Sequence, residues 1–218
     1  EIGVRLVGSE MCIRDSSNTI DFEELGNKKT ALFVITPADH STYDYILTIF
    51  FSQMLQILYS QANRNGGTLT NQVYFLLDEF ANIGQIPDFN KKLSTTRSLG
   101  MSMSIVVQSL DQLEGLYKDT YENIIGNCDT QLFLGSQAIK TCEYINKSLG
   151  QKTIKIQSRS VSKDKDERSK QGVSLSEQRQ GRDLMTVDEL KRLNPNKEIL
   201  LVRGCKPILA DKAFYFKY

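Results

Sequence analysis

Short runs of apolar residues alternate with longer amphipathic stretches along most of the chain. Four of the runs predict buried strands, and the run over 30–36 is β-branched and aromatic and is bounded by Lys28, Lys29 and Pro37. The stretches between them repeat their apolar residues with a helical period, and apolar strands separated by helices indicate a mostly parallel sheet covered on both faces. The sequence therefore predicts an α/β domain, with these strands over residues 30–36, 72–77, 102–108 and 129–134.

The predicted helices lie between capping and turn signals. The first begins at Ser41, with Asp44 three residues later in a capping-box arrangement, and ends near Asn63, before Gly66 and Gly67. Its wide apolar face has a polar edge, so we favour a helix that packs on a sheet and not one that spans a membrane. Further helices are predicted over 87–98, 109–117, 119–125, 136–149 and 186–193, and two closing strands over 199–203 and 207–216.

The first sixteen residues differ from the rest of the chain. EIGVRLVGSEMCIRDS contains Glu1, Glu10 and Asp15 and lacks the apolar core of a targeting peptide. It resembles translated sequencing-adapter read-through, so we interpret residues 1–16 as an artefact; the alternative is a short disordered lead-in. On the first interpretation the protein's own sequence continues upstream of Ser17.

Composition excludes several classes of protein. The 218 residues are 40% hydrophobic and 24% charged, as in a soluble globular domain. The net charge is only +1, so any nucleic-acid surface must be a local patch. Four cysteines without a CxxC pair and a single histidine exclude a zinc ribbon, a disulfide-stapled scaffold and most histidine-based catalysis. No run of about 18 apolar residues occurs, so no membrane span is expected within the chain.

The composition shifts over residues 151–182, which carry nine basic and four acidic side chains. Apolar residues are few there, so we expect a solvated, mobile loop. One interpretation is a loop that contacts DNA phosphates, and the other is a surface loop without a ligand. The basic residues proposed for DNA contact are Lys163, Lys165, Arg168 and Lys170.

The strand predicted over 72–77 runs directly into Asp78 and Glu79. A buried strand fixes the groups at its carboxyl end, and in P-loop ATPases two carboxylates there form the Walker B site. Asp78 would hold Mg²⁺ beside the ATP phosphates, and Glu79 would orient and deprotonate the attacking water. The alternative is an acidic pair that stabilises the dipole of a following helix. These two residues alone leave both interpretations open.

Longer segments around this pair resemble the motor domain of type IV secretion coupling proteins, the conjugative TraG family. The segments are VYFLLDEFANIGQIPDF, STTRSLGMSMSIVVQS and NIIGNCDTQLFLG, followed by GRDLMTVDEL and ILLVRGCKPILADK. The resemblance runs from about Gly26 to the C-terminus and implies a RecA-like P-loop NTPase fold, a homo-hexamer, and ATP hydrolysis with Mg²⁺. It also implies delivery of a relaxase-bound single DNA strand or protein effectors to a type IV secretion channel. The parent protein would lie at the cytoplasmic face of the inner membrane, held by helices upstream of this chain.

The resemblance assigns roles to four residues. Asp78 and Glu79 match the Walker B pair, Arg97 matches the arginine finger that reaches a neighbouring subunit's γ-phosphate, and Gln108 matches the glutamine that senses the γ-phosphate. A guanidinium can stabilise phosphoryl charge in trans, and an amide beside the carboxylates can donate to a phosphate oxygen. The structural alternatives are a cation that offsets the dipole of its helix for Arg97 and a cap at the sheet edge for Gln108.

The family's phosphate-binding loop, GxxxxGK[ST], does not occur in the sequence. The nearest segment, GNKKT at 26–30, has one glycine and precedes a predicted strand. In the family that loop lies upstream, beyond a helical insertion, so we expect this chain to be the C-terminal part of the motor and to bind and hydrolyse ATP poorly alone. Two alternatives stay open: an FtsK- or HerA-like translocase of double-stranded DNA, and a non-catalytic half-motor that binds DNA or partners.

Overall fold

The computed structural model describes residues 20–36, 44–162, 172–214 and 216. The chain forms two compact units, Glu1–Cys128 and Asp129–Tyr218. The interpretation of residues 1–16 as an artefact and the cap at Ser41 lie outside the described residues, and both stay predictions. None of the described helices is both long and apolar enough to cross a bilayer.

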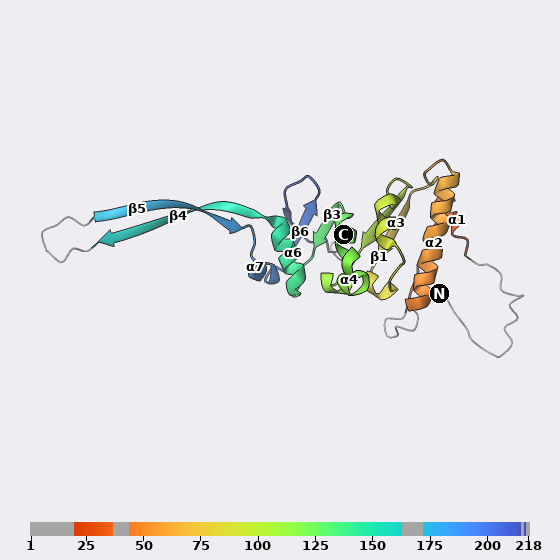
Figure 1. Cartoon of the computed structure of the whole chain (residues 1–218), viewed down its shortest axis with the longest axis horizontal. Helices are drawn as coiled ribbons and strands as arrows, with labels where there is room; N and C mark the ends of the chain where they lie inside the picture. Colours follow the sequence, from red (N-terminus) through yellow and green to blue (C-terminus); the bar gives the residue numbers. More distant parts are fainter. Residues whose placement is uncertain (1–19, 37–43, 163–171, 215, 217–218) are drawn as a thin grey trace, which may run out of the picture. The chain divides into compact units, whose positions relative to one another are not determined.

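The first unit is built around a parallel pair of strands (Figure 1). The strand β1 (Val73–Leu77) pairs in parallel with β2 (Met101–Ile105), so the expected parallel sheet is confirmed. The long helix α2 (Asp44–Arg64) ends before Gly66 and Gly67, whose φ angles of 82° and 106° stop the helix as predicted. The shorter helices are α1 (Glu23–Asn27), η3 (Phe80–Ile83), α3 (Phe89–Thr96), α4 (Leu110–Tyr117), η4 (Lys118–Thr120) and α5 (Tyr121–Gly126).

The core of this unit lies between α2 and the parallel pair. Leu55 and Leu58 of α2 are fully or almost fully buried in the same cluster as Phe75 and Leu77 of β1. Burying a side chain of this size contributes about 1.5–3 kcal/mol, so the cluster holds β1 against the helix. The strand is therefore a rigid support for whatever follows its carboxyl end.

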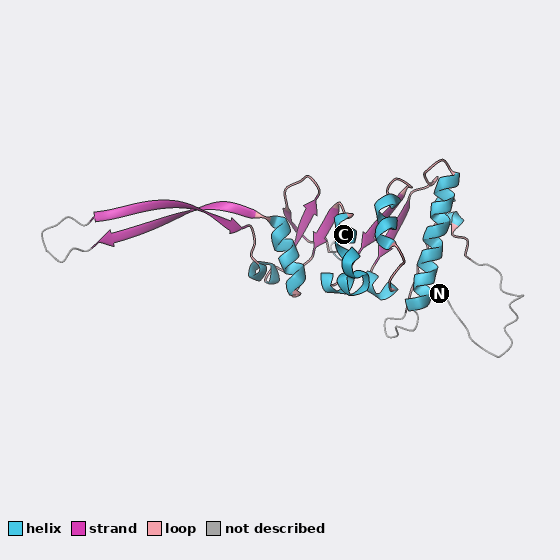
Figure 2. Cartoon of the chain, viewed as in Figure 1, coloured by secondary structure: helices cyan, strands magenta, loops and turns pink. Residues whose placement is uncertain are grey.

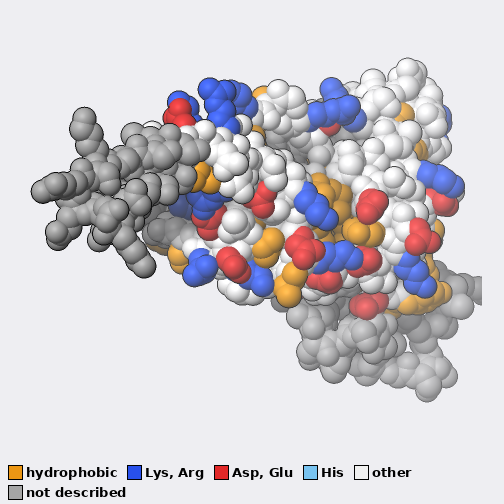
Figure 3. Space-filling view, turned by 60° about the vertical axis from the view of Figure 1, so that its left-hand side comes forward, with side chains coloured by type: hydrophobic (Ala, Val, Ile, Leu, Met, Phe, Trp, Pro, Cys, Tyr) orange, Lys and Arg blue, Asp and Glu red, His pale blue; other side chains and the backbone are white. Residues whose placement is uncertain are grey.

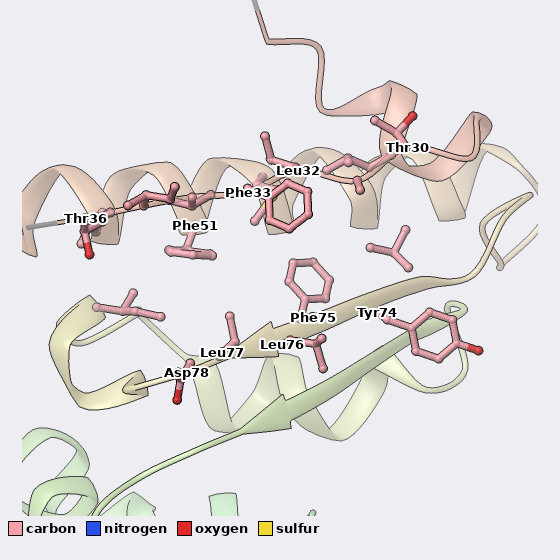
Figure 4. Close-up of a pocket in the computed structure, with 18 of the residues that line it drawn as sticks. Thr30, Leu32, Phe33, Thr36, Phe51, Tyr74, Phe75, Leu76, Leu77 and Asp78 are labelled. Carbon is pink, nitrogen blue, oxygen red and sulfur yellow. The ribbon is translucent and has the colours of Figure 1, made fainter. Parts of the chain in front are cut away.

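The prediction of a strand over residues 30–36 is wrong. This segment is extended but has no sheet partner among the described residues. Figure 4 shows it running in the same direction as β1, with a cavity between the two. A strand needs a neighbour at hydrogen-bonding distance, and the cavity prevents this pairing. As a result Phe33 and Ile35 are 80% and 77% exposed instead of buried.

The second unit contains an antiparallel sheet that the sequence did not predict as such. Its strands follow the order β3 (Thr130–Phe133), β6 (Lys197–Val202) and β7 (Ile208–Asp211). A short turn that includes Gly204, at a φ of 77°, joins β6 to β7, and so short a connection permits only antiparallel neighbours. The helices α6 (Ile139–Leu149) and α7 (Val187–Lys191) pack together beside this sheet and confirm the two helices predicted there.

The expected loop over 151–182 is instead a two-stranded ribbon in its described part. The strands β4 (Gln151–Ser162) and β5 (Gly172–Asp183) pair antiparallel over their whole length, without a bulge (Figure 2). The two strands are joined by a backbone ladder and contain few apolar residues, so the hydrophobic pattern gave no signal of them. Four predicted DNA contacts lie outside the described residues: Lys163, Lys165, Arg168 and Lys170.

Candidate functional site

The candidate site begins at the carboxyl end of β1. Three of the five β1 residues are buried, whereas Asp78 and Glu79, which follow the strand, are exposed. Both ends of the strand are bonded to the segment around β2: the Val73 N–H donates to the Gly100 carbonyl, and the Val106 N–H donates to the Leu77 carbonyl, each at 3.0 Å. The two carboxylates are thus placed by a fixed strand, as the sequence predicted.

The turn after β1 orients both carboxylates. Glu79 has left-handed backbone angles, φ 46° and ψ 47°, a conformation that costs a non-glycine residue on the order of 1 kcal/mol. Its N–H donates to Oδ1 of Asp78 at 3.0 Å. Nδ2 of Asn82 donates to Oε2 of Glu79 at 2.7 Å. Each carboxylate is therefore held by a local hydrogen bond although both face solvent.

A buried aromatic cluster holds this turn in its strained form. The ring of Phe80 is fully buried, and the Phe80 N–H donates to the Val106 carbonyl at 3.0 Å. The ring lies 4.9 Å from the ring of Phe89 and 5.9 Å, nearly parallel, from that of Tyr117. The Tyr117 hydroxyl accepts a hydrogen bond from the Ile86 N–H, and burial raises the pKa of Tyr117 to about 12. The cluster anchors the residue directly after Glu79.

The far end of the turn is tied to α2. Thr48 donates from Oγ1 to the Ile83 carbonyl at 3.1 Å. Gly84 follows with a φ of 82°, and a Cβ at that position would lie 2.7 Å from Thr48 Oγ1. The close approach and the positive φ both require glycine, so the helix and the turn are packed without room for a side chain.

Gln108 lies at the same edge of the parallel pair as the carboxylates. Parallel strands end at one edge of a sheet, and Leu77 is in register with Ile105, three residues before Gln108. The Gln108 N–H donates to Oε1 of Gln112 at 3.1 Å, and its side chain is exposed. The structure thus brings Asp78, Glu79 and Gln108 to one edge; the role of each stays a prediction.

Arg97 lies at the opposite edge. It is the C-cap of α3 and precedes by three residues Gly100, which is bonded to the amino end of β1. Its side chain is exposed. Since β1 separates the two edges, this arrangement places Arg97 away from the carboxylates of its own chain.

Asn82 is the site residue that the sequence analysis missed. It lies three residues after Glu79 on the single turn η3, a spacing that brings two side chains to the same side of a helical turn. The sequence DEFAN places an asparagine three residues after Glu79, which is compatible with this contact. That spacing alone did not predict the contact, because the left-handed conformation of Glu79 was not evident from the sequence.

The carboxylate pair fits a magnesium ion better than it fits a closed metal site. Among the described residues there is no group of three or more side chains able to hold a metal. Mg²⁺ binds through one or two carboxylates and takes its remaining ligands from water and substrate phosphates, so two carboxylates suffice. Asp78 and Glu79 also line one end of a cavity of about 1010 Å³ between β1, α2 and residues 28–36 (Figure 4). Its lining is mostly apolar and includes Lys28, Lys29 and Asn71 among its polar residues.

Comparison with known proteins gives a consistent result. A family model described as type IV secretory system conjugative DNA transfer matches residues 13–218. The chain is 27% identical over 208 residues to the protein VirD4 of Agrobacterium fabrum, covering 94% of the chain and 30% of VirD4. It is 23% identical over 208 residues to the conjugal transfer protein TraG of Escherichia coli, covering 86% of the chain and 32% of TraG. The chain thus spans about a third of the length of these relatives.

A solved structure supports the fold. The bacterial conjugative coupling protein TrwBΔN70 matches with a TM-score of 0.58 at 16% identity, covering 78% of this chain and 38% of TrwB. This likeness confirms the RecA-like α/β fold expected from the sequence. Because the family model matches nearly the whole chain, the chain belongs to the type IV secretory system conjugative DNA transfer family.

Proposed function

We propose that this chain is the C-terminal part of the motor of a conjugative coupling ATPase. The complete protein would hydrolyse ATP to deliver a relaxase-bound single DNA strand or protein effectors to a type IV secretion channel. The observation that carries the proposal is the fixed pair Asp78 and Glu79 at the edge that also holds Gln108, in a chain of this family. Structures of TrwB with ADP and Mg²⁺ and with a non-hydrolysable ATP analogue support nucleotide binding by such proteins.

The two carboxylates would divide the work at this edge. Bound Mg·ATP supplies the phosphoryl group, and the ion neutralises charge on its phosphates. Asp78, whose Oδ1 is fixed by the Glu79 N–H, would hold the ion through water. Glu79 would accept a proton from the attacking water; with Oε2 bonded to Asn82, the accepting atom would be Oε1. Gln108 would donate from its amide to a phosphate oxygen.

Arg97 would act on the ATP bound to a neighbouring copy. Its place at the amino-terminal edge of β1 supports this role, because one chain does not bring it to its own carboxylates. A guanidinium spreads its five donors in a fork that matches phosphate oxygens, which makes arginine suited to the task. The complete protein would therefore work as a ring, proposed to be a homo-hexamer at the cytoplasmic face of the inner membrane.

The 218 residues by themselves would bind ATP weakly. The sequence contains no GxxxxGK[ST] loop, whose backbone N–H groups and lysine hold the phosphates. The same observation supports a second candidate, a non-catalytic half-motor that binds DNA or partners. The family match disfavours the FtsK- or HerA-like alternative.

The proposal can be tested in the complete protein with two isosteric variants. Asp78→Asn and Glu79→Gln should each reduce ATP hydrolysis and DNA transfer between cells, Glu79→Gln by about 100-fold or more because general-base catalysis contributes that much. Glu143→Gln, at an exposed carboxylate on α6, is the matched control and should leave both unchanged. A folded Glu79→Gln protein with more than half of the wild-type ATP hydrolysis would show that Glu79 is not the general base and would overturn the proposed site, whereas a folded wild-type complete protein without ATP hydrolysis would favour the non-catalytic half-motor.

A further inference from the structure

The ribbon formed by β4 and β5 is held only by its own backbone ladder. It pairs with no other strand among the described residues. Two-stranded antiparallel ribbons are marginally stable in water unless something covers one face. Where its side chains are described, at residues 151–157 and 177–183, most of them are exposed. Such a ribbon is suited to contact with a partner.

The register of the ribbon brings like charges together. Lys152 lies directly opposite Arg182, and Lys155 directly opposite Arg179. Like charges directly across an antiparallel pair destabilise it, so four cations in two facing pairs disfavour the free ribbon and favour a complex with an anion. Lys152 and Lys155 are three positions apart, which places one pair of cations on each face.

Part of this charge is already compensated. Arg182 pairs with Glu189 of α7 at 2.7 Å, and Lys155 pairs with Glu177 at 3.5 Å. Among the described residues, Lys152 and Arg179 have no carboxylate within ion-pair distance. Elsewhere the surface carries Lys and Arg interspersed with Asp and Glu, as Figure 3 shows for one face of the molecule. The facing cation pairs are therefore a local feature of the ribbon.

The residue types on the ribbon indicate which polyanion it suits. Residues 151–183 contain no Phe, Tyr or Trp. Proteins that bind single strands commonly stack bases on aromatic side chains, and this ribbon cannot do so. Lysine, arginine and glutamine instead donate to phosphate oxygens, which carry no sequence information. A duplex offers a higher density of phosphates than a single strand.

The dimensions of the ribbon also suit a duplex. Each strand has twelve residues, a length of roughly 40 Å at about 3.3 Å per residue. One turn of B-DNA is about 34–36 Å long, and its major groove admits a two-stranded ribbon. We propose that the β4–β5 ribbon is an arm that binds the phosphate backbone of double-stranded DNA without reading its sequence. The choice of DNA over other polyanions rests on the proposed function.

The full 218-residue chain can test this proposal by fluorescence anisotropy. The probes are a labelled mixed-sequence duplex and a single strand of the same length, titrated at several salt concentrations. The wild-type chain should bind the duplex more tightly than the single strand. Lys155→Gln/Arg179→Gln should weaken duplex binding and make the plot of log K against log salt shallower by about 1.8, because each phosphate contact contributes about 0.9.

Three control variants distinguish the possible causes of a change in duplex binding. Lys91→Gln/Lys147→Gln removes two exposed cations from α3 and α6 and should change neither affinity nor slope. Lys155→Arg/Arg179→Lys keeps both charges and should bind as the wild type does, which separates lost contacts from a misfolded ribbon. Glu79→Gln should bind the duplex normally, so loss of ATP hydrolysis and loss of DNA binding are separate results.

Four results would overturn the proposal. The wild-type chain could bind no duplex, it could prefer the single strand, or the Lys155→Gln/Arg179→Gln variant could keep the wild-type slope. Binding to polyglutamate but not to DNA would likewise overturn it, and would point to an acidic protein partner.

Discussion

The turn after β1 and the β4–β5 ribbon both present charged side chains to solvent, but they hold them in different ways. At the turn, exposed Asp78 and Glu79 are flanked by residues in the core: Leu77 is 6% exposed and Phe80 fully buried. In the ribbon, Lys155 and Arg179 stand on strands that have no core beneath them in the described part of the chain. Charge position is fixed by packing in the first region and by a backbone ladder in the second.

This difference matches what each region is proposed to do. Transfer of a phosphoryl group requires carboxylates held to within a fraction of an ångström, and packed supports provide that. Contact with the phosphate backbone tolerates movement, because its energy comes from charge neutralisation along the whole polyanion. Substitutions should therefore act on stability and catalysis in the first region, and on binding in the second.

The largest effect is expected at the aromatic anchor. Phe80→Ala should lower the free energy of unfolding of the first unit by about 3–5 kcal/mol, since it opens a cavity beneath the turn. Phe33→Ala, at a ring that is 80% exposed, is the control and should cost under about 1 kcal/mol. Denaturant unfolding of the two variants measures the difference, and equal losses would show that the turn does not depend on its anchor.

A smaller effect should come from alkaline pH. Burial raises the pKa of Tyr117 from 10.0 to about 12, so the folded state keeps its proton when the unfolded state has lost it. The resulting stability is fully present below pH 10 and is lost as pH rises toward 12, by up to about 2–3 kcal/mol. Tyr117→Phe should remove this part of the pH dependence, measured by unfolding at pH 9 to 12. Tyr74→Phe, at an exposed ring, should retain it.

Removal of the Asn82 amide should affect catalysis more than folding. In the complete protein, Asn82→Ala should lower kcat about 10-fold with KM unchanged, because a hydrogen bond to a charged group contributes about 1.5–3 kcal/mol and this one is exposed. Asn82→Asp should lower kcat further, since its carboxylate repels that of Glu79. A kcat equal to wild type in both variants would mean that Asn82 does not position Glu79.

The smallest effect should be a gain in stability. Arg179→Glu places a carboxylate opposite Lys155, and replacing a like pair with an opposite pair should stabilise the ribbon by about 0.2–1 kcal/mol. The same variant should bind duplex DNA more weakly. Amide hydrogen exchange of β4 and β5 measures the first effect. Slower exchange of β4 and β5 together with unchanged DNA binding would show that the ribbon does not bind DNA.

The sequence predicted the parts of the fold that are built on a local apolar pattern. The strand β1 and the helix α2 have strong periodicity and clear ends, so both were placed within a few residues of their bounds. The position of Asp78 and Glu79 followed from β1. The extended segment 30–36 has an equally good strand pattern, but pairing depends on a neighbour that the pattern does not specify.

Other features could not be predicted because their cause lies outside the hydrophobic pattern. Polar residues predominate in both strands of the ribbon, so its register became evident only from the pairing of Gln151 with Asp183 and of the residues that follow. Asn82 contacts Glu79 because Glu79 adopts left-handed angles, which the buried Phe80 supports. In both cases tertiary structure determined the outcome, whereas the sequence pattern reported only local preference.

We propose that one ATP site combines the carboxylates of one copy with Arg97 of another, since the two lie at opposite edges of the parallel pair. The most direct test is ATP hydrolysis by mixtures of two variants of the complete protein, Glu79→Gln and Arg97→Ala, each inactive alone. Mixing should restore part of the activity, because some interfaces then combine an intact Glu79 with an intact Arg97. Mixed assemblies that form but stay inactive would contradict it.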